Sequence, residues 1–188
     1  MITMSLTKTQ LIGKIYGAFK DVLLEDGIGL WEGLALDDRL QNTREYEALK
    51  AKDERHDWQK IPVVNLYECS SSISFLDAKG MRFHMGLYLL FALEVFLAEE
   101  DELHEDENFI LFPTEVQFAL TYNLESEYSK NRFSLLNSAQ INCVVHFLEY
   151  ELDKMRQYGE AYGVQAGQLL HKEHKKLEEA IAFWKVNT

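Results

Sequence analysis

The sequence predicts an all-α protein, and three observations support this fold class. Apolar residues recur at the 3.6-residue spacing of an amphipathic helix along most of the 188-residue chain. The chain contains only 2 prolines, and neither lies inside a periodic apolar segment, so helices are rarely interrupted. The segment Leu87–Ala98 is apolar at every position except Glu94, and a helix that is apolar on all sides has to be covered on all sides.

This apolar segment is too short to cross a bilayer, which takes about 20 apolar residues, and its length is typical of a buried core helix. We therefore expect a helical bundle around a buried central helix over about residues 81–98, with Asp77 as its N-cap. The hydrophobic content of 47% is sufficient for a packed core, and we expect one domain over residues 1–188. Glu94 has to meet a partner, water or the surface, because an unpaired buried carboxylate is costly.

Local signals predict the elements before the central helix. Thr7 and Gln10 form the pattern of a capping box, in which each side chain satisfies the other residue's free amide. The helix that they begin is expected to end near Leu24, where Gly27 can adopt a positive φ at low cost. A short segment over residues 26–38 and a charged surface helix over residues 43–52 are expected next.

Further signals predict the elements after the central helix. The residues 99–107 are expected to form an acidic surface loop, because like charges disfavour a helix. Proline 113 is expected to begin a helix that runs to Tyr122. Asn137 and Gln140 repeat the capping pattern before a helix that should stop at Gly159, and a last helix is expected over residues 165–185.

The formal net charge of −12 excludes the class of proteins that bind a phosphate backbone, because such proteins need clustered Lys and Arg. It also disfavours an anionic membrane surface. The N-terminus has no apolar core of the signal-peptide type, and Cys69 and Cys143 are too few and too far apart for a disulfide framework. We therefore expect a cytoplasmic protein with reduced thiols. Its negative charge either serves only to keep the protein soluble or attracts a basic protein partner.

Three stretches, taken in order, resemble a bacterial family of uncharacterised proteins. They are DGIGLWEGLALDD, FLDAKGMRFHMGLYLL and RFSLLNSAQINCVVHFLEY. In that family the first block usually reads Gly-Ile-x-Leu-x-Glu-Ala and the second Phe-Leu-Asp-x-x-Gly-x-Arg-Phe, followed by Leu-Pro-Ala-Tyr. Here Gly33 stands where the family has alanine, and Met85-Gly86 stands where it has Leu-Pro. The resemblance, over residues 8–155, implies a compact domain and no particular activity.

The first two of these blocks also carry a set of charged groups. If the two segments meet, carboxylates, a guanidinium and an imidazole would converge beside apolar walls, which is the composition of a ligand pocket or an acid/base site. The alternative is structural: Glu32 and Arg82 form an ion pair, and Asp77 only caps a helix. The candidate ligand-binding residues are Glu32, Asp37, Asp77, Arg82 and His84.

The remaining polar groups favour ordinary structural roles. His171 and His174 lie one helical turn apart, but a zinc site needs further ligands, and the neighbouring lysines disfavour a cation. His146 lies on an apolar helix and is expected to be a core histidine. The sequence contains no catalytic signature, no cofactor motif and no metal-ligand spacing, so we expect neither a cofactor nor a metal.

We interpret the chain as a non-catalytic protein-interaction module, of the kind that inhibits a toxin or gives immunity to it. The contact would be made by the acidic run, in which 7 of the 9 residues from Glu99 to Glu107 are acidic, with the exposed side of residues 43–57. Its chief residues are Glu99, Glu100, Asp101 and Glu102. The alternative is a small-ligand binder or a hydrolase-like enzyme that uses the carboxylate, Arg and His groups described above.

Overall fold

The computed structural model describes residues 6–96, 114–162 and 164–186, and within these ranges the chain is helical and contains no strand. This confirms the all-α prediction. The helices are α1 (Lys8–Ala18), α2 (Leu30–Asp37), α3 (Arg44–Lys50), α4 (Val64–Glu68), α5 (Ala78–Ala92), α7 (Thr114–Thr121), α8 (Glu127–Phe133), α9 (Ser138–Tyr162) and α10 (Val164–Val186), with short 3-10 helices η1 (Trp58–Lys60) and η2 (Ser70–Ser74).

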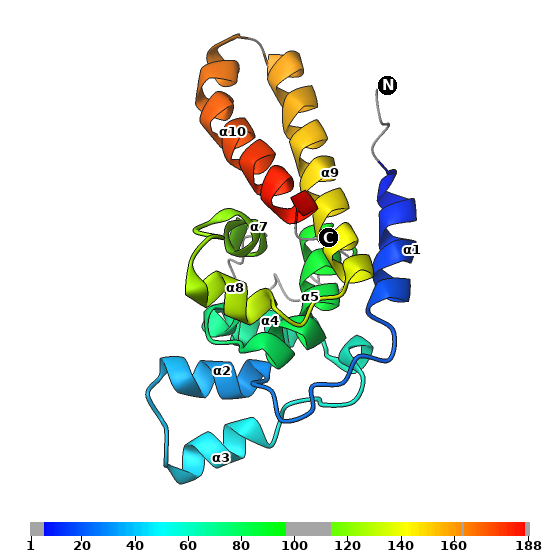
Figure 1. Ribbon diagram of the computed structural model, residues 1–188. Helices are drawn as coiled ribbons and strands as arrows, with labels where there is room; N and C mark the ends of the chain where they lie inside the picture. The colour runs from blue at the N-terminus through cyan, green and yellow to red at the C-terminus, as the bar shows by residue number, and fades with distance from the viewer. Residues whose placement is uncertain (1–5, 97–113, 163, 187–188) are drawn as a thin grey trace.

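The helices are arranged in two parts that meet at α5 (Figure 1). The long helices α9 and α10 run antiparallel as a hairpin, and α1 packs along α9. The pair α2 and α3 lies at the other end of the molecule, where α2 packs against η2. Between them, α5 contacts α1, α7, α8 and η1.

The central helix is buried as the sequence predicts, but its bounds differ. Every residue of α5 from Gly80 to Ala92 except Arg82 is buried. The helix begins at Ala78, with the Asp77 side chain accepting a hydrogen bond from the backbone N–H of Gly80, and it ends at Ala92 rather than near residue 98. The reason for the early end is visible at Glu94, which has a φ of 56° and cannot continue a helix. The Glu94 carboxylate lies at the surface, 3.6 Å from Nζ of Lys154.

The capping box at Thr7 is confirmed, since Thr7 and Gln10 exchange hydrogen bonds at the start of α1. The end of this helix was predicted wrongly: it stops at Ala18, and the left-handed conformations fall on Asp21 and Glu25 rather than on Gly27. Gly27 is required for a different reason. A Cβ at Gly27 would lie 2.6 Å from the Cβ of Lys79, so only glycine lets the chain cross the start of α5 at this point.

Gly86 shows why the departure from Leu-Pro matters. α5 runs without a break through Met85 and Gly86, so the helix does not start there. A Cβ at Gly86 would lie 3.0 Å from the Cβ of Phe19 and 3.3 Å from the indole ring of Trp58. The missing side chain therefore lets two large aromatic residues, both fully buried or nearly so, pack directly on the central helix.

The predictions for the C-terminal half are confirmed at the helix starts and less well at the ends. Asn137 and Gln140 exchange two hydrogen bonds of 3.0 Å at the start of α9, and α7 and α10 match the predicted ranges closely. α9 continues past Gly159 to Tyr162. Two short helices, α4 and α8, were not predicted from the sequence. In the described ranges no helix has both the length and the apolar character needed to cross a membrane.

Candidate functional site

The five residues singled out by the sequence do not form one site. Asp77 accepts hydrogen bonds through Oδ1 from the backbone N–H groups of Gly80 (2.8 Å) and Ile28 (3.1 Å), so it both caps α5 and holds the segment before α2. Asp37 is exposed at the last position of α2.

His84 is a buried structural histidine. It is 1% exposed, and its Nδ1 lies 2.8 Å from the carbonyl oxygen of Gly80, one turn earlier in α5. Burial lowers the pKa of His84 to about 4. The imidazole is therefore neutral near pH 7 and donates its Nδ1 hydrogen to that carbonyl.

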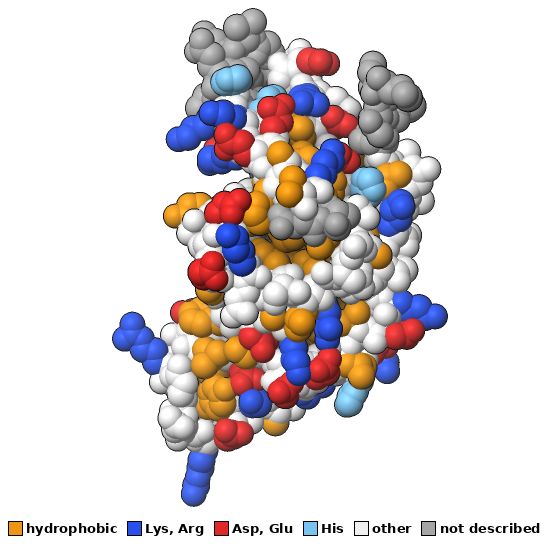
Figure 2. Space-filling view, in the orientation of Figure 1, with side chains coloured by type: hydrophobic (Ala, Val, Ile, Leu, Met, Phe, Trp, Pro, Cys, Tyr) orange, Lys and Arg blue, Asp and Glu red, His pale blue; other side chains and the backbone are white. Residues whose placement is uncertain are grey.

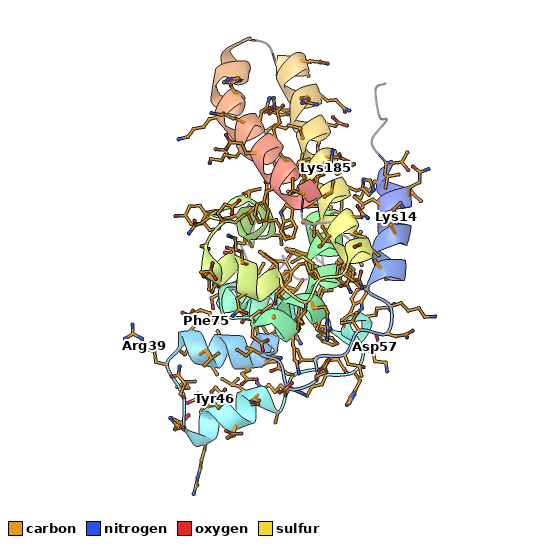
Figure 3. All side chains as sticks on the ribbon, viewed as in Figure 1. Lys14, Arg39, Tyr46, Asp57, Phe75 and Lys185 are labelled. Atoms are coloured by element: carbon orange, nitrogen blue, oxygen red, sulfur yellow. The ribbon has the colours of Figure 1, made fainter. Side chains whose placement is uncertain are left out.

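Glu32 forms a buried network between α2 and α3. Its Oε1 accepts a hydrogen bond from the hydroxyl group of Tyr46 at 2.5 Å and lies 2.7 Å from Nζ of Lys50. Figure 3 shows Tyr46 in the space between these two helices. The hydrogen bond to Glu32 and burial raise the pKa of Tyr46 to about 12. The same region holds Asp53, which accepts from the backbone N–H groups at the start of α2 and whose pKa burial raises to about 6.

The predicted ion pair between Glu32 and Arg82 is wrong. Arg82 donates through Nη2 to Oε1 of Glu25 at 2.6 Å, and Lys79 binds the other oxygen of the same carboxylate at 2.8 Å. Glu25 takes the place predicted for Glu32 as the partner of Arg82, because the turn at Glu25 comes back over the first turn of α5, and Glu32 pairs with Lys50 instead. Arg82 therefore joins a surface cluster and not the network around Glu32.

A pocket of about 740 Å³ lies elsewhere, where η2, α7 and α8 meet. This volume is in the range of small-molecule sites. None of the five predicted residues is among its described lining residues. Two serines and Ile73 come from η2, α7 and the residues directly after it present an acidic and two aromatic side chains, and α8 closes the other side. The lining residues are Ser71, Ile73, Ser74, Glu115, Phe118, Ala119, Tyr122, Asn123, Ser126, Tyr128, Ser129 and Arg132.

Arg132 is the most unusual residue of this pocket. It is 8% exposed, and it donates through Nη1 to the Tyr128 hydroxyl group at 3.1 Å. That hydroxyl donates in turn to the Ser74 carbonyl at 2.5 Å. Nε and Nη2 of Arg132 are buried and have no acceptor, and the described residues place no carboxylate within ion-pair distance of the guanidinium. Burial lowers its pKa, yet arginine stays protonated in proteins. The pocket wall therefore holds a buried positive charge for which the described part of the chain supplies no counter-charge.

The opposite wall is aromatic and exposed. The ring of Phe118 on α7 stacks with the ring of Tyr122, the residue that follows the end of α7, with centroids 4.7 Å apart. They are 59% and 62% exposed, so more than half of their apolar surface faces solvent or the pocket. Exposed aromatic pairs beside a buried arginine are typical of binding sites, where such residues contribute most of the affinity.

Sequence reasoning missed this site, although one signal was present. Arg132 and Phe133 open the third block that resembles the family, RFSLLNSAQINCVVHFLEY, and we assign them no role from the sequence. Ser126 also has the position of an N-cap, and it accepts from the backbone N–H of Ser129 to begin α8. The burial of Arg132 could not be predicted, because it depends on α5 and η2 covering that short helix.

The remaining predicted groups lie apart from this pocket. Glu99, Glu100, Asp101 and Glu102 lie outside the described residues. His146, expected in the core, is partly exposed and lies 3.2 Å from Oε2 of Glu149. Within the described ranges no group of three or more His, Cys, Asp and Glu could hold a metal ion. On the face seen in Figure 2, acidic and basic side chains are interspersed.

Comparison with known proteins gives one match. The model of a protein family described as "Family of unknown function (DUF6714)" matches residues 7–185. The match includes the whole of the pocket between η2, α7 and α8. No curated protein and no solved structure matches the chain.

Proposed function

The chain belongs to this family of unknown function, and we propose that it is a binding protein that takes a small organic anion in the pocket between η2, α7 and α8. The observation that carries the proposal is the uncompensated guanidinium of Arg132 on the pocket wall. Membership of this family does not indicate a ligand or a reaction, so the class of ligand has to be inferred from the residues of the pocket.

The charge of Arg132 favours an anion for an energetic reason. A buried N–H group without an acceptor costs about 1–3 kcal/mol, and more when the group is charged. The field of a buried charge is also screened less than the field of a charge in water. An anionic group that enters beside Tyr128 is therefore strongly attracted to the Arg132 guanidinium at short range. The hydroxyl groups of Ser71 and Ser129 line the same pocket and can donate further hydrogen bonds to it.

The other lining residues favour an organic ligand over an inorganic ion. Phe118, Tyr122 and Ile73 give the pocket apolar surface that a phosphate or chloride ion would leave exposed. Among the described lining residues only Arg132 is cationic, so a ligand with several negative charges, such as a nucleotide, would be poorly balanced. A compact anion with an apolar body fits both features.

The proposal is tested by isothermal titration calorimetry of the full chain with 3-phenylpropionate, phenyl phosphate and phenylalanine. At least one should bind, and Arg132→Gln should weaken its binding by about tenfold or more, because a charge-assisted hydrogen bond contributes about 1.5–3 kcal/mol. Arg156→Gln removes an exposed guanidinium on α9 that pairs with Glu178, so it changes the net charge equally and should leave binding intact.

The thermal midpoint of both variants shows whether the fold is retained. If none of the three ligands binds, or if both arginine variants bind equally well, the proposal is wrong.

The protein-interaction module predicted from the acidic run stays a second possibility for the chain, and it is independent of this pocket. It is supported only by the composition of residues 99–107. Binding of a basic partner through that run would be weakened by moderate salt, whereas binding in the pocket would depend on Arg132.

A further inference from the structure

A second charged group lines the same pocket. Glu115 lies in the first turn of α7, and its side chain has no cationic partner within ion-pair distance among the described residues. Burial raises the pKa of its carboxyl group. The Glu115 side chain is nevertheless exposed, so the pocket presents a solvent-accessible carboxylate that no described residue neutralises.

Glu115 and Arg132 do not neutralise one another. No ion pair joins them, although both lie close enough to the buried hydroxyl group of Tyr88 to act on its ionisation. They come from different helices, α7 and α8, which form two walls of the pocket. Two opposite charges on one cavity, neither of which pairs with an opposite charge among the described residues, are complementary to a ligand that carries both charges itself.

The aromatic pair adds a third requirement. Phe118 lies about one turn after Glu115 on α7 and Tyr122 directly follows the end of α7, so both rings continue the wall that begins at Glu115. The face of an exposed aromatic ring binds another planar ring by offset stacking, which contributes about 0.5–1.5 kcal/mol beyond the area buried. A ligand held by Glu115 at one end therefore meets aromatic surface along the same wall.

We propose that the ligand is a small aromatic zwitterion, of the chemical class of a free aromatic amino acid, whose carboxylate faces Arg132, whose ammonium group faces Glu115 and whose ring lies on Phe118 and Tyr122. This inference rests on the proposed function and specifies the ligand of that site. A residue inside a peptide chain carries neither charge, so the pocket selects the free molecule over a peptide segment.

The test uses four ligands that share one phenyl ring, titrated into the full chain by calorimetry. Phenylalanine carries both charges, 3-phenylpropionate only the negative one, 2-phenylethylamine only the positive one, and N-acetylphenylalanine amide neither. Phenylalanine should bind about fivefold or more tighter than 3-phenylpropionate, a factor that corresponds to about 1 kcal/mol for a partly exposed ion pair. The uncharged amide should not bind measurably.

Two variants test which charged side chain of the pocket binds which charged end of the ligand, and a third tests the aromatic surface. Glu115→Gln should abolish the preference for phenylalanine and leave the affinity for 3-phenylpropionate unchanged or higher, whereas Arg132→Gln should weaken both. Phe118→Leu should reduce the preference for phenylalanine over cyclohexylalanine, since it removes the stacking surface and keeps the apolar one. Thermal midpoints of all variants report on folding.

The outcomes separate the two proposals. If 3-phenylpropionate binds as tightly as phenylalanine and loses affinity in Arg132→Gln, the anion pocket holds and the zwitterion is wrong. The zwitterion is equally wrong if Glu115→Gln keeps the preference for phenylalanine. If neither phenylalanine nor 3-phenylpropionate binds, this inference is wrong, and if phenyl phosphate does not bind either, the proposed function fails with it.

Discussion

Arg132 donates through Nη1 to the hydroxyl group of Tyr128, one turn earlier in α8, at 3.1 Å. The same hydroxyl donates to the carbonyl of Ser74 at 2.5 Å, so a tyrosine that is 54% exposed links the buried guanidinium to η2. The guanidinium also lies 5.2 Å from the centre of the Tyr128 ring. Tyr128 is therefore a positioning residue for Arg132 rather than a ligand contact by itself.

Tyr128→Phe should keep the ring and remove the link. Because a third N–H group of Arg132 then loses its acceptor, we expect a loss of about 1 kcal/mol in the free energy of unfolding, measured by urea denaturation. The affinity for whichever anion binds the pocket should fall by several-fold. Unchanged stability together with unchanged affinity would show that the hydroxyl does not hold Arg132.

Lys50→Met should destabilise the protein more than Arg82→Ala. Lys50 binds the Glu32 carboxylate, whose side chain is only 5% exposed, so the variant leaves a buried charge with Tyr46 alone. We expect a loss of about 2 kcal/mol, reduced from the value for a fully buried pair because Lys50 itself is partly exposed. Arg82 pairs with an exposed carboxylate that Lys79 also binds, so its loss should barely change the thermal midpoint. A larger loss of stability in Arg82→Ala than in Lys50→Met would instead support the pairing of Glu32 with Arg82 that the sequence predicts.

Gly33→Ala should be destabilising although it places a good helix former inside α2. The added Cβ would lie 2.8 Å from the Cβ of Ser72, whose hydroxyl group donates to the carbonyl of Leu30 at 2.6 Å. We expect a loss of about 1–3 kcal/mol from overpacking, measured by chemical denaturation. Gly13→Ala is the matched control, because a Cβ there has no neighbour within 4 Å and should stabilise α1 by about 0.5–1 kcal/mol. Equal effects at the two positions would show that α2 and η2 can separate.

His84 should make the protein less stable as the pH falls from 7 to 5. Its pKa is about 4 in the folded chain and about 6.5 in the unfolded chain, so between these values the unfolded chain binds more protons. Stability that is present above pH 6.5 is lost on acidification, by about 2 kcal/mol between pH 7 and pH 5. In His84→Gln this part of the pH dependence should disappear, whatever the absolute stability of the variant.

Asp53 should act in the opposite direction over the same range. Its pKa is raised from 3.8 to about 6, so the folded chain binds more protons than the unfolded chain between these values. The contribution of Asp53 therefore falls as the pH rises from 5 to 7, by about 1 kcal/mol. Comparing the wild type with Asp53→Asn at both pH values measures it. A variant with the same pH dependence as the wild type would show that Asp53 does not titrate in this range.

Much of the fold could be predicted from the sequence because it depends on local signals. These signals are helical periodicity and side chains that cap a helix within one turn of its start. The starts of α1 at Thr7, α9 at Asn137 and α5 at Asp77 are all confirmed. Helix ends were predicted less well. α1 and α5 stop where Asp21 and Glu94 take positive φ values, which no glycine marks in the sequence.

Pairing and burial were decided by the tertiary structure. The sequence by itself determined that the chain is helical, that α5 is buried on almost every side, and which side chains carry charge. It did not determine that Glu32 meets Lys50, that Arg82 meets Glu25, or that Arg132 is enclosed without a counter-charge. The physical reason is that helical propensity and capping depend on neighbours within four residues, whereas these contacts join segments 18 to 57 residues apart and follow from how the helices pack.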